Sequence, residues 1–300
     1  MTDTTEPESL PMMQPVAPEI LPILDADLEM VCQFLHERLN RKLSPALWKN
    51  AYSQPWMANA PNHGFMLVDE ERVAGVFGAI YAERTIRGVT ERFCNQNSWV
   101  VLESYRHLSL ELWRALMAQT GYHVTMLTPN PVVAKIYLTR RFQTMGNGVT
   151  VIPNTPWPKA LKARVVGERQ EMLTLLSGES VRDCRLHRPF PWLHQVALGD
   201  ARGVCHVVFK LGRWKRMPAA KLLHVSDGET FLRLHPALGR HLLWKHGVTT
   251  LHLSSRLLPQ RPLGSFEIVD TQPRLFLSDR LSERDISWLY TEMVALDLAV

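Results

Sequence analysis

Cysteine is scarce in this sequence of 300 residues: Cys32, Cys94, Cys184 and Cys205 are scattered, and no two have Cys-x-x-Cys spacing. This argues against a cysteine zinc site and a disulfide framework, so buried free thiols are expected. Long apolar runs are also missing, since none approaches the roughly 18 residues that a membrane span needs. Residues 1–20 are acidic and proline-rich, without the basic start and apolar stretch of a signal peptide. We therefore expect a cytoplasmic protein with a disordered leader, no membrane span and no metal.

A concentrated excess of one charge is absent as well. Lysine and arginine number 34 against 29 aspartates and glutamates, and the net charge is +5. The one compact basic cluster, Lys210–Arg216, is interpreted as an exposed turn between strands. This pattern is not the dense basic stripe of a nucleic-acid-binding protein, although a modest positive charge suits an anionic ligand such as a nucleotide cofactor. We expect no nucleic-acid partner.

The sequence does have enough apolar residues for a sizeable core. Hydrophobic residues make up 46% of the chain, and its length favours two domains over one. Three prolines within residues 153–158 can continue neither a helix nor a strand, so the boundary is predicted there. The predicted organisation is a leader (1–20), a first domain (21–152), a linker (153–167) and a second domain (168–300).

Apolar periodicity predicts the same order of elements in both domains: two helices, three antiparallel strands, a helix and a further strand. In the first domain, the later strands and helices are expected at 92–101, 108–117, 122–127 and 132–141. In the second domain, the last elements are a helix at 229–246, strands at 248–254 and 274–277, and a helix at 286–298. The predicted fold class is α/β (α+β), with two lobes that are each a mixed, mostly antiparallel sheet flanked by helices.

Two segments of the first domain carry chemical information. The strand at 92–101 runs directly into Glu103-Ser-Tyr-Arg-His-Leu-Ser-Leu-Glu111 and then into a helix. A helix N-terminus presents unpaired backbone N–H groups and a partial positive charge, which suit a pyrophosphate. The second segment, Asn130-Pro-Val-Val-Ala-Lys-Ile-Tyr-Leu-Thr-Arg-Arg-Phe142, follows the strand at 122–127 and is predicted to be helical.

Together these segments resemble the GNAT superfamily of acetyl-CoA-dependent acyltransferases. Tyr105 and Arg106 match the strand–turn–helix pattern of the family, which has glycines where this chain has Ser109 and Glu111. The second segment is similar to the family pattern Asn-x-x-Ala-x-x-x-Tyr-x-x-x-Gly-Phe, with Arg141 in place of the glycine. The resemblance covers most of the first domain and implies acetyl-CoA or another acyl-CoA as co-substrate. The second domain has no counterpart of either motif, which implies a degenerate GNAT-like lobe that shapes the acceptor site.

The resemblance also implies where the cofactor would bind. Main-chain amides of the turn would hold the pyrophosphate, provided that the Glu111 carboxylate points outward. A strand amide would stabilise the oxyanion of a tetrahedral intermediate, and Asn130 would contact the cofactor or cap the next helix. The predicted cofactor-binding residues are Val100, Val101, Leu102, Arg106, His107, Leu108, Ser109, Leu110 and Asn130.

Tyr137 is the predicted general acid. The resemblance implies a tyrosine near the thioester sulfur, and a phenol with a pKa of about 10 can protonate a departing thiolate. Glu103 is the predicted general base, with His107 as a second candidate, and both can equally be surface or capping residues. Trp99 would either face the acyl or substrate channel or pack in the core.

The sequence thus predicts an acyltransferase that moves an acyl group from acyl-CoA to an amine or hydroxyl of a small molecule or saccharide. The alternative is a non-catalytic GNAT fold that binds a partner or senses acyl-CoA, which Glu111 and Arg141 in the glycine positions favour. In the second domain, His224 and Asp227 are interpreted either as an acid–base pair or as a core histidine and a helix cap.

Overall fold

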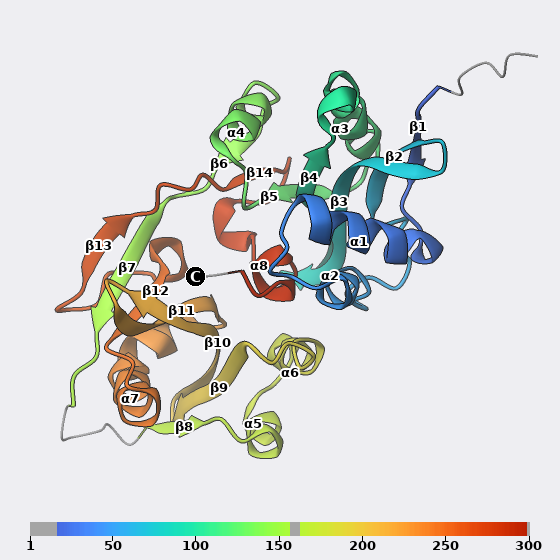
Figure 1. The fold of residues 1–300 in the computed structure, drawn as a ribbon. Helices are drawn as coiled ribbons and strands as arrows, with labels where there is room; N and C mark the ends of the chain where they lie inside the picture. Colours follow the sequence, from blue (N-terminus) through green and yellow to red (C-terminus); the bar gives the residue numbers. More distant parts are fainter. Residues whose placement is uncertain (1–16, 157–162, 299–300) are drawn as a thin grey trace, which may run out of the picture.

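The computed structural model describes residues 17–156 and 163–298, and they form two seven-stranded sheets with helices on their faces (Figure 1). This confirms the predicted α/β architecture of two lobes. Each sheet contains one parallel pair of strands, and its other pairs are antiparallel. The predicted leader lies largely outside the described residues, and Glu19 and Ile20 belong to the first strand.

The first sheet contains, in spatial order, β1 (Glu19–Pro22), β2 (Gly64–Asp69), β3 (Arg72–Ile86), β4 (Val89–Val101), β5 (His123–Met126), β14 (Leu275–Leu277) and β6 (Gln143–Thr144). Its helices are α1 (Leu28–Arg38), α2 (Pro45–Tyr52), α3 (Ser109–Met117) and α4 (Pro131–Leu138). Helix α2 begins as the sequence predicts, because the Ser44 side chain accepts a hydrogen bond from the Leu47 N–H and Pro45 occupies the first turn.

The second sheet contains, in spatial order, β8 (Arg164–Val166), β9 (Leu193–Asp200), β10 (Gly203–Trp214), β11 (Met217–Val225), β12 (Thr250–Ser254), β7 (Gly148–Pro153) and β13 (Phe266–Val269). Its helices are α5 (Arg169–Leu175), α6 (Glu179–Leu186) and α7 (Gly228–His246). Strands β11 and β12 are parallel and joined through α7, as β4 and β5 are parallel and joined through α3. The two sheets are therefore a repeat of one strand order.

The lobes exchange one strand each, which the sequence does not predict. Strand β7 leaves the first lobe and pairs with β12 in the second sheet, and β14 returns to pair with β5 in the first sheet. A contiguous first domain ending at residue 152 and a linker at 153–167 therefore do not correspond to the sheets, because β7 and β8 already belong to the second one. Local periodicity indicates where a strand lies but not which strand it pairs with, so it cannot predict an exchange of strands between lobes.

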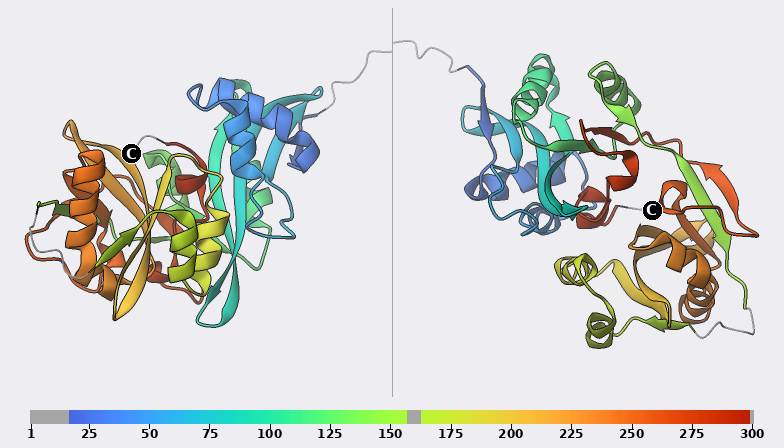
Figure 2. Two further views of the ribbon diagram at one scale, coloured as in Figure 1. Left: turned by 90° about the horizontal axis from the view of Figure 1, so that it is seen from below. Right: turned by 180° about the vertical axis from the view of Figure 1, so that it is seen from behind.

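One hydrophobic core joins the lobes. It combines α1 and α2 with the C-terminal segment 286–296, and it extends to Val208 and Leu223 on the second sheet. The opposite face of the first sheet packs on α3 and α4, and α7 covers the second sheet. In all three views the C-terminal segment lies between the two lobes (Figures 1 and 2). The lobes thus pack together through a shared core.

The C-terminal segment is not the helix that the sequence predicts at 286–298. The short 3-10 helix η4 (Glu283–Asp285) precedes it, and extended and turn residues lead from there to the four-residue helix α8 (Glu292–Ala295). Trp288, Leu289 and Tyr290 are all buried. A segment buried on several sides is apolar at nearly every position, so its sequence cannot distinguish a helix from an irregular strap.

The structure bears on the predictions made for the cysteines and for membrane-spanning segments. All four cysteines are buried free thiols, as predicted. Within the ranges 17–156 and 163–298, none of the helices combines the length and the apolar character that crossing a bilayer requires.

Candidate active site

The candidate site begins where two parallel strands part. Strands β4 and β5 pair from Phe93–His123 to Gln96–Met126. Strand β5 then ends, whereas β4 continues to Val101. Among the described residues, no strand pairs with β4 on this side beyond Gln96.

A bulge in β4 lies at this point. Gly78 pairs with Asn97 and Val76 with Val100, so Ser98 and Trp99 together oppose one residue of β3. Ser98 has a φ of 53°, in the left-handed region that non-glycine residues rarely adopt. Bulges bend a strand and redirect its side chains, and this one turns residues 97–99 toward the gap between β4 and β5.

Buried hydrogen bonds hold the bulge in place. The Asn97 Oδ1 atom accepts from the Tyr52 hydroxyl at 2.7 Å and from the Ser98 hydroxyl at 2.8 Å. Residue 78 must be glycine for this contact, because a Cβ there would lie 2.0 Å from the Tyr52 hydroxyl oxygen. Helix α2 therefore fixes the conformation of β4 at the opening.

A cavity of about 320 Å³ occupies the gap. It is enclosed by the end of α1, by α2, by the β4 bulge, by the loop after β5 and by the C-terminal segment. The residues that line it are Leu39, Asn40, Trp48, Asn97, Ser98, Trp99, Met126, Thr128, Pro129, Asn130, Val133, Glu292, Leu296 and Leu298. The wall is mainly apolar with a few convergent polar groups, which is typical of a small-molecule site.

Three buried polar atoms at this cavity have no hydrogen-bond partner among the described residues. They are the indole nitrogens of Trp48 and Trp99 and the Oε2 atom of Glu292. A buried polar group without a partner costs about 1–3 kcal/mol, and native proteins rarely leave several together. A polar ligand that reached these two donors and one acceptor would satisfy them.

Glu292 is the most unusual of these groups. Its side chain is 1% exposed, and its Oε1 atom accepts from the Thr128 hydroxyl at 2.9 Å. Its backbone N–H donates to Asn95 Oδ1 at 3.1 Å, which attaches α8 to β4. Burial raises the pKa of the Glu292 carboxyl to about 7, and the hydrogen bond from Thr128 opposes this only in part. A carboxyl with a pKa near neutrality can take up and release a proton under physiological conditions.

Tyr137 lies in the protein interior beside the point where the strands part. It is fully buried, and its hydroxyl donates to the side-chain oxygen of Gln96, the last β4 residue paired with β5. Burial raises the pKa of this phenol well above its usual value, so it keeps its proton. Tyr137 is not among the described residues that line the cavity, and its predicted role as an acid stays a prediction.

The turn before α3 differs from the predicted row of free amides. Residues Glu103–Leu108 form a 3-10 helix, η2, that runs straight into α3. The Ser109 N–H donates to the Arg106 carbonyl, and a 3-10 helix engages its successive N–H groups in the same way. Without glycines these residues adopt ordinary right-handed helical angles, and the free N-terminal amides move back to Glu103 and Ser104.

Most side chains between Arg106 and Leu110 lie at the protein surface. Arg106, His107 and Leu110 are exposed, while Leu108 and Ser109 are half-buried. The Glu111 carboxylate forms an ion pair with Arg114 one turn along α3, which offsets its charge. The repulsion expected from Glu111 is thereby weakened.

The three strand residues predicted to bind the oxyanion are not equivalent. The Leu102 N–H already donates to the Ala74 carbonyl at 2.8 Å, so it is not available. Val100 lies two residues earlier in the strand, so its N–H points toward β3 as the Leu102 N–H does. Successive strand amides point to opposite edges, and the Val101 N–H therefore faces the open side.

Asn130 and Trp99 each combine the two roles considered for them. The Asn130 side chain caps α4 by accepting from the Val133 N–H at 2.9 Å, and the residue also lines the cavity. Trp99 stacks on Phe77 with ring centroids 4.7 Å apart, and its indole also lines the cavity. The wall of the cavity is thus part of the packed core.

The structure gives no support to Glu103 as the general base. Its side chain is 81% exposed and forms an ion pair with Arg106 at 3.0 Å. Neither Glu103 nor His107 is among the described residues that line the cavity. The structure places Glu292 there instead. Sequence reasoning missed it because it lies 189 residues beyond Glu103 in the chain, although Glu292 is the one charged residue between Trp288 and Leu296.

The second-domain pair separates into two different environments. Asp227 caps α7 by accepting from the Thr230 N–H at 2.6 Å. His224 instead faces Asp183, with its Nε2 atom 4.0 Å from Asp183 Oδ2. The reading of Asp227 as a cap is confirmed.

Arg141 occupies the position of the missing glycine, and its φ of 68° lies in the left-handed region. We expect Arg141→Gly to raise the free energy of unfolding by about 0.5–1 kcal/mol, because the strain of about 1–2 kcal/mol exceeds the entropy that glycine adds to the unfolded chain. Thr139→Gly, at a φ of −70°, is the control and should lose about 1 kcal/mol. Denaturant titration measures both, and a destabilised Arg141→Gly would contradict the strain.

No family model and no curated protein matches the sequence. Solved structures do match its fold. A GCN5-related N-acetyltransferase from Anabaena variabilis ATCC 29413 aligns with a TM-score of 0.59 at 9% identity, over 87% of this chain and 72% of that one. A probable N-acyltransferase from Enterococcus faecalis V583 aligns at 0.57 and 11% identity over the same shares. A putative acetyltransferase from Pyrococcus horikoshii aligns at 0.51 and 11% identity, over 95% of this chain and 96% of that one. The chain therefore has the GNAT fold in two lobes.

Proposed function

We propose that the protein is an acyltransferase that binds acyl-CoA between β4 and β5 and passes the acyl group to an amine or hydroxyl. The acceptor would be a small molecule or saccharide. The observation that carries this proposal is the cavity at the point where the parallel strands part. Trp48, Trp99 and Glu292 line it, and their indole nitrogens and Oε2 atom have no hydrogen-bond partner in the described part of the chain. The fold adds support, because its relatives of known structure are described as acetyltransferases.

Glu292 would act as the general base. The acceptor nucleophile must lose a proton as it attacks the thioester carbonyl, and a carboxylate at the cavity wall is placed to accept it. Thr128 fixes one carboxylate oxygen, which leaves the Oε2 atom for the acceptor. This assignment replaces Glu103, whose carboxylate is exposed and already paired.

The remaining steps would use the β4 edge and Tyr137. The Val101 N–H faces the open side of β4 and would stabilise the oxyanion that forms on the carbonyl oxygen. When the tetrahedral intermediate collapses, the carbon–sulfur bond breaks and the Tyr137 hydroxyl gives its proton to the thiolate. Its raised pKa keeps that proton in place until a strong base such as a thiolate appears.

Acyl-CoA binding is expected to raise the thermal midpoint of the purified protein. A ligand at about a hundred times its Kd adds about 2.7 kcal/mol to the free energy of unfolding. Differential scanning fluorimetry with acetyl-CoA and with free coenzyme A measures the effect.

A matched pair of variants on α4 locates the binding site. Val133 lines the cavity, so Val133→Trp should fill it and abolish the stabilisation. The neighbouring Val132 is 69% exposed, and Val132→Trp should leave the stabilisation unchanged. Equal stabilisation of both variants would place the cofactor elsewhere, and no stabilisation of the wild type would contradict acyl-CoA binding.

A further inference from the structure

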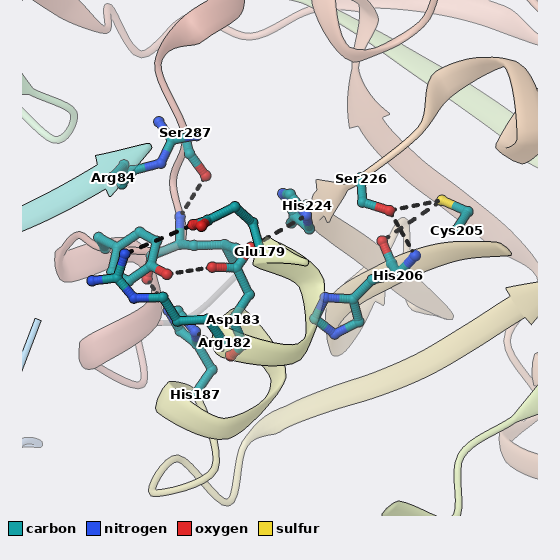
Figure 3. A network of polar contacts seen from close by, with 12 residues as sticks. Arg84, Glu179, Arg182, Asp183, His187, Cys205, His206, His224, Ser226 and Ser287 are labelled. Atoms are coloured by element: carbon teal, nitrogen blue, oxygen red, sulfur yellow. Dashed lines mark hydrogen bonds and ion pairs between the residues drawn. The ribbon is translucent and has the colours of Figure 1, made fainter. Parts of the chain in front are cut away.

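A second cluster of chemically active side chains lies in the other lobe, away from the cavity. Asp183 on α6, His206 on β10 and His224 on β11 each direct one potential ligand atom to a common point, and these atoms all lie within 4.8 Å of one another (Figure 3). Asp183 and His206 are buried and His224 is half-buried. The proposed acyl transfer uses none of the three.

The repeated topology explains why polar groups meet here. Strand β11 makes its last pair with β12 at Leu222, and His224 lies two residues further along. In the first lobe, Ser98 lies two residues beyond Gln96, the last β4 residue paired with β5. The cluster thus occupies the position in the second lobe that corresponds to the opening of the first, and α6 packs over it.

The imidazole of His206 is held in the tautomer that a metal requires. Its Nε2 atom lies 2.9 Å from the Gln195 Oε1 atom, an acceptor, so Nε2 carries the proton and Nδ1 has the free lone pair. That Nδ1 atom is fully buried and has no partner among the described residues. Metal-binding histidines characteristically donate their second N–H to a carbonyl or carboxylate oxygen in this way.

His224 and Asp183 complete the arrangement. The His224 Nε2 atom is also buried without a partner in the described chain. The Asp183 Oδ1 atom accepts from the Tyr290 hydroxyl, and Oδ2 faces His224 at 4.0 Å. The nearby His187 is excluded as a ligand, because both of its ring nitrogens face backbone carbonyl oxygens at 2.8 and 2.6 Å.

The cluster contains one carboxylate, and two guanidinium groups lie near it (Figure 3). Neutral imidazole is the form that binds metals, and each of the two rings has one buried nitrogen without a partner among the described residues. In the described ranges, Asp183 forms no ion pair with a lysine or arginine. Both guanidinium groups have other partners, because Arg84 donates to the Asp285 carbonyl oxygen and Arg182 forms an ion pair with Glu179.

We propose that Asp183, His206 and His224 form a binding site for a divalent transition-metal cation, with Zn²⁺ as the expected occupant. Two imidazoles and one carboxylate are a common donor set for zinc, and water would complete a tetrahedron. Bonds of about 2.0–2.2 Å hold tetrahedral ligand atoms roughly 3.4 Å apart, so the cluster would contract by about an ångström on binding. The metal would join α6 to β10 and β11 and, through Tyr290, secure the segment that leads to Glu292.

The test is a metal titration of the full chain after treatment with a chelator. Co²⁺ should bind with one-to-one stoichiometry and give the strong visible absorption of a tetrahedral site, and Zn²⁺ should displace it and raise the thermal midpoint. Absence of stoichiometric binding would overturn the proposal. This measurement involves no acyl-CoA, so its outcome is independent of the proposed acyl transfer.

Variants identify the ligands. His206→Gln and His224→Gln should each lower the affinity for Co²⁺ by more than about 100-fold, because loss of an outer partner alone costs about 10–100-fold. His252→Gln is the matched control, a buried histidine of the same sheet that bonds to Thr250, and it should bind as the wild type does. If the ligand variants fail to fold, Gln195→Ala tests the assignment instead, and its affinity for Co²⁺ should be lower by about 10–100-fold. Unchanged affinity in Gln195→Ala, or equal loss in the control, would overturn the assignment.

Discussion

Glu292→Gln should lower the rate constant for acyl transfer by about 10²–10⁴-fold, the usual contribution of a positioned general base. The substitution keeps the size of the side chain and its bond to Thr128, so the cavity and its affinity for acyl-CoA should hardly change. Release of coenzyme A in the presence of an acceptor measures the rate, and calorimetry measures the affinity. A variant that binds and turns over like the wild type would remove Glu292 from the mechanism.

The pH dependence gives the same residue a second signature. A base works in its deprotonated form, so wild-type activity should rise with pH through about 7, and the variant should lack this limb. Stability should change in the opposite sense. The folded-state pKa of Glu292 lies above the unfolded value, and the folded protein therefore binds more protons between the two pKa values.

This linkage predicts that the wild type loses about 3 kcal/mol of stability as pH rises from about 4.5 to about 7 through this group alone. Glu292→Gln cannot lose a proton. Its stability relative to the wild type should therefore be greater at about pH 8 than at about pH 5. Denaturant titrations at the two pH values measure the difference, and a constant difference would contradict the buried, titrating carboxyl.

Tyr137→Phe is expected to lower acyl transfer by roughly 10²-fold or more, as loss of a general acid commonly does. Acyl-CoA affinity should change little, because main-chain amides elsewhere would hold the pyrophosphate. The variant should also lose about 1–3 kcal/mol of stability, because the buried Gln96 oxygen is left without its donor. This cost exceeds that of an exposed hydroxyl and must be measured separately by denaturation.

Tyr81→Phe is the matched control for this variant. Tyr81 is also a buried phenol of the first lobe, it donates to Asn62 at 3.0 Å, and it does not line the active-site cavity. It should lose similar stability and keep full turnover. If both variants keep full turnover, Tyr137 is a packing residue and not the general acid.

The sequence predicts the fold well where structure follows from local pattern. The central strands of each lobe, the α7 helix and the Ser44 and Asn130 caps depend on periodicity and on side-chain bonds a few residues apart. The exchange of β7 and β14 depends instead on contacts between segments that are far apart in the chain. The irregular C-terminal segment 286–296 is mostly apolar and buried between the lobes, and its sequence therefore does not distinguish a helix from an irregular segment.

In the candidate site, too, the sequence predicts the local segments and misses the long-range contacts. The strand–turn–helix and the Asn130 segment are local, and both lie at or beside the cavity. The free amides of the turn lie earlier in the chain than the sequence predicts. Helix-compatible residues replace the glycines, and the later N–H groups then donate hydrogen bonds within η2. Glu292 reaches the cavity only because the chain returns to the first lobe, and no spacing rule connects it with β4.

Hydrogen–deuterium exchange with and without acetyl-CoA tests the central claim most directly, because it reports where the cofactor binds and not only whether it binds. Binding between β4 and β5 should slow exchange at the amides of residues 97–104, at the start of α4 and around Glu292, and leave the second sheet unchanged. Protection confined to the second lobe, or no protection at saturating acetyl-CoA, would contradict the account.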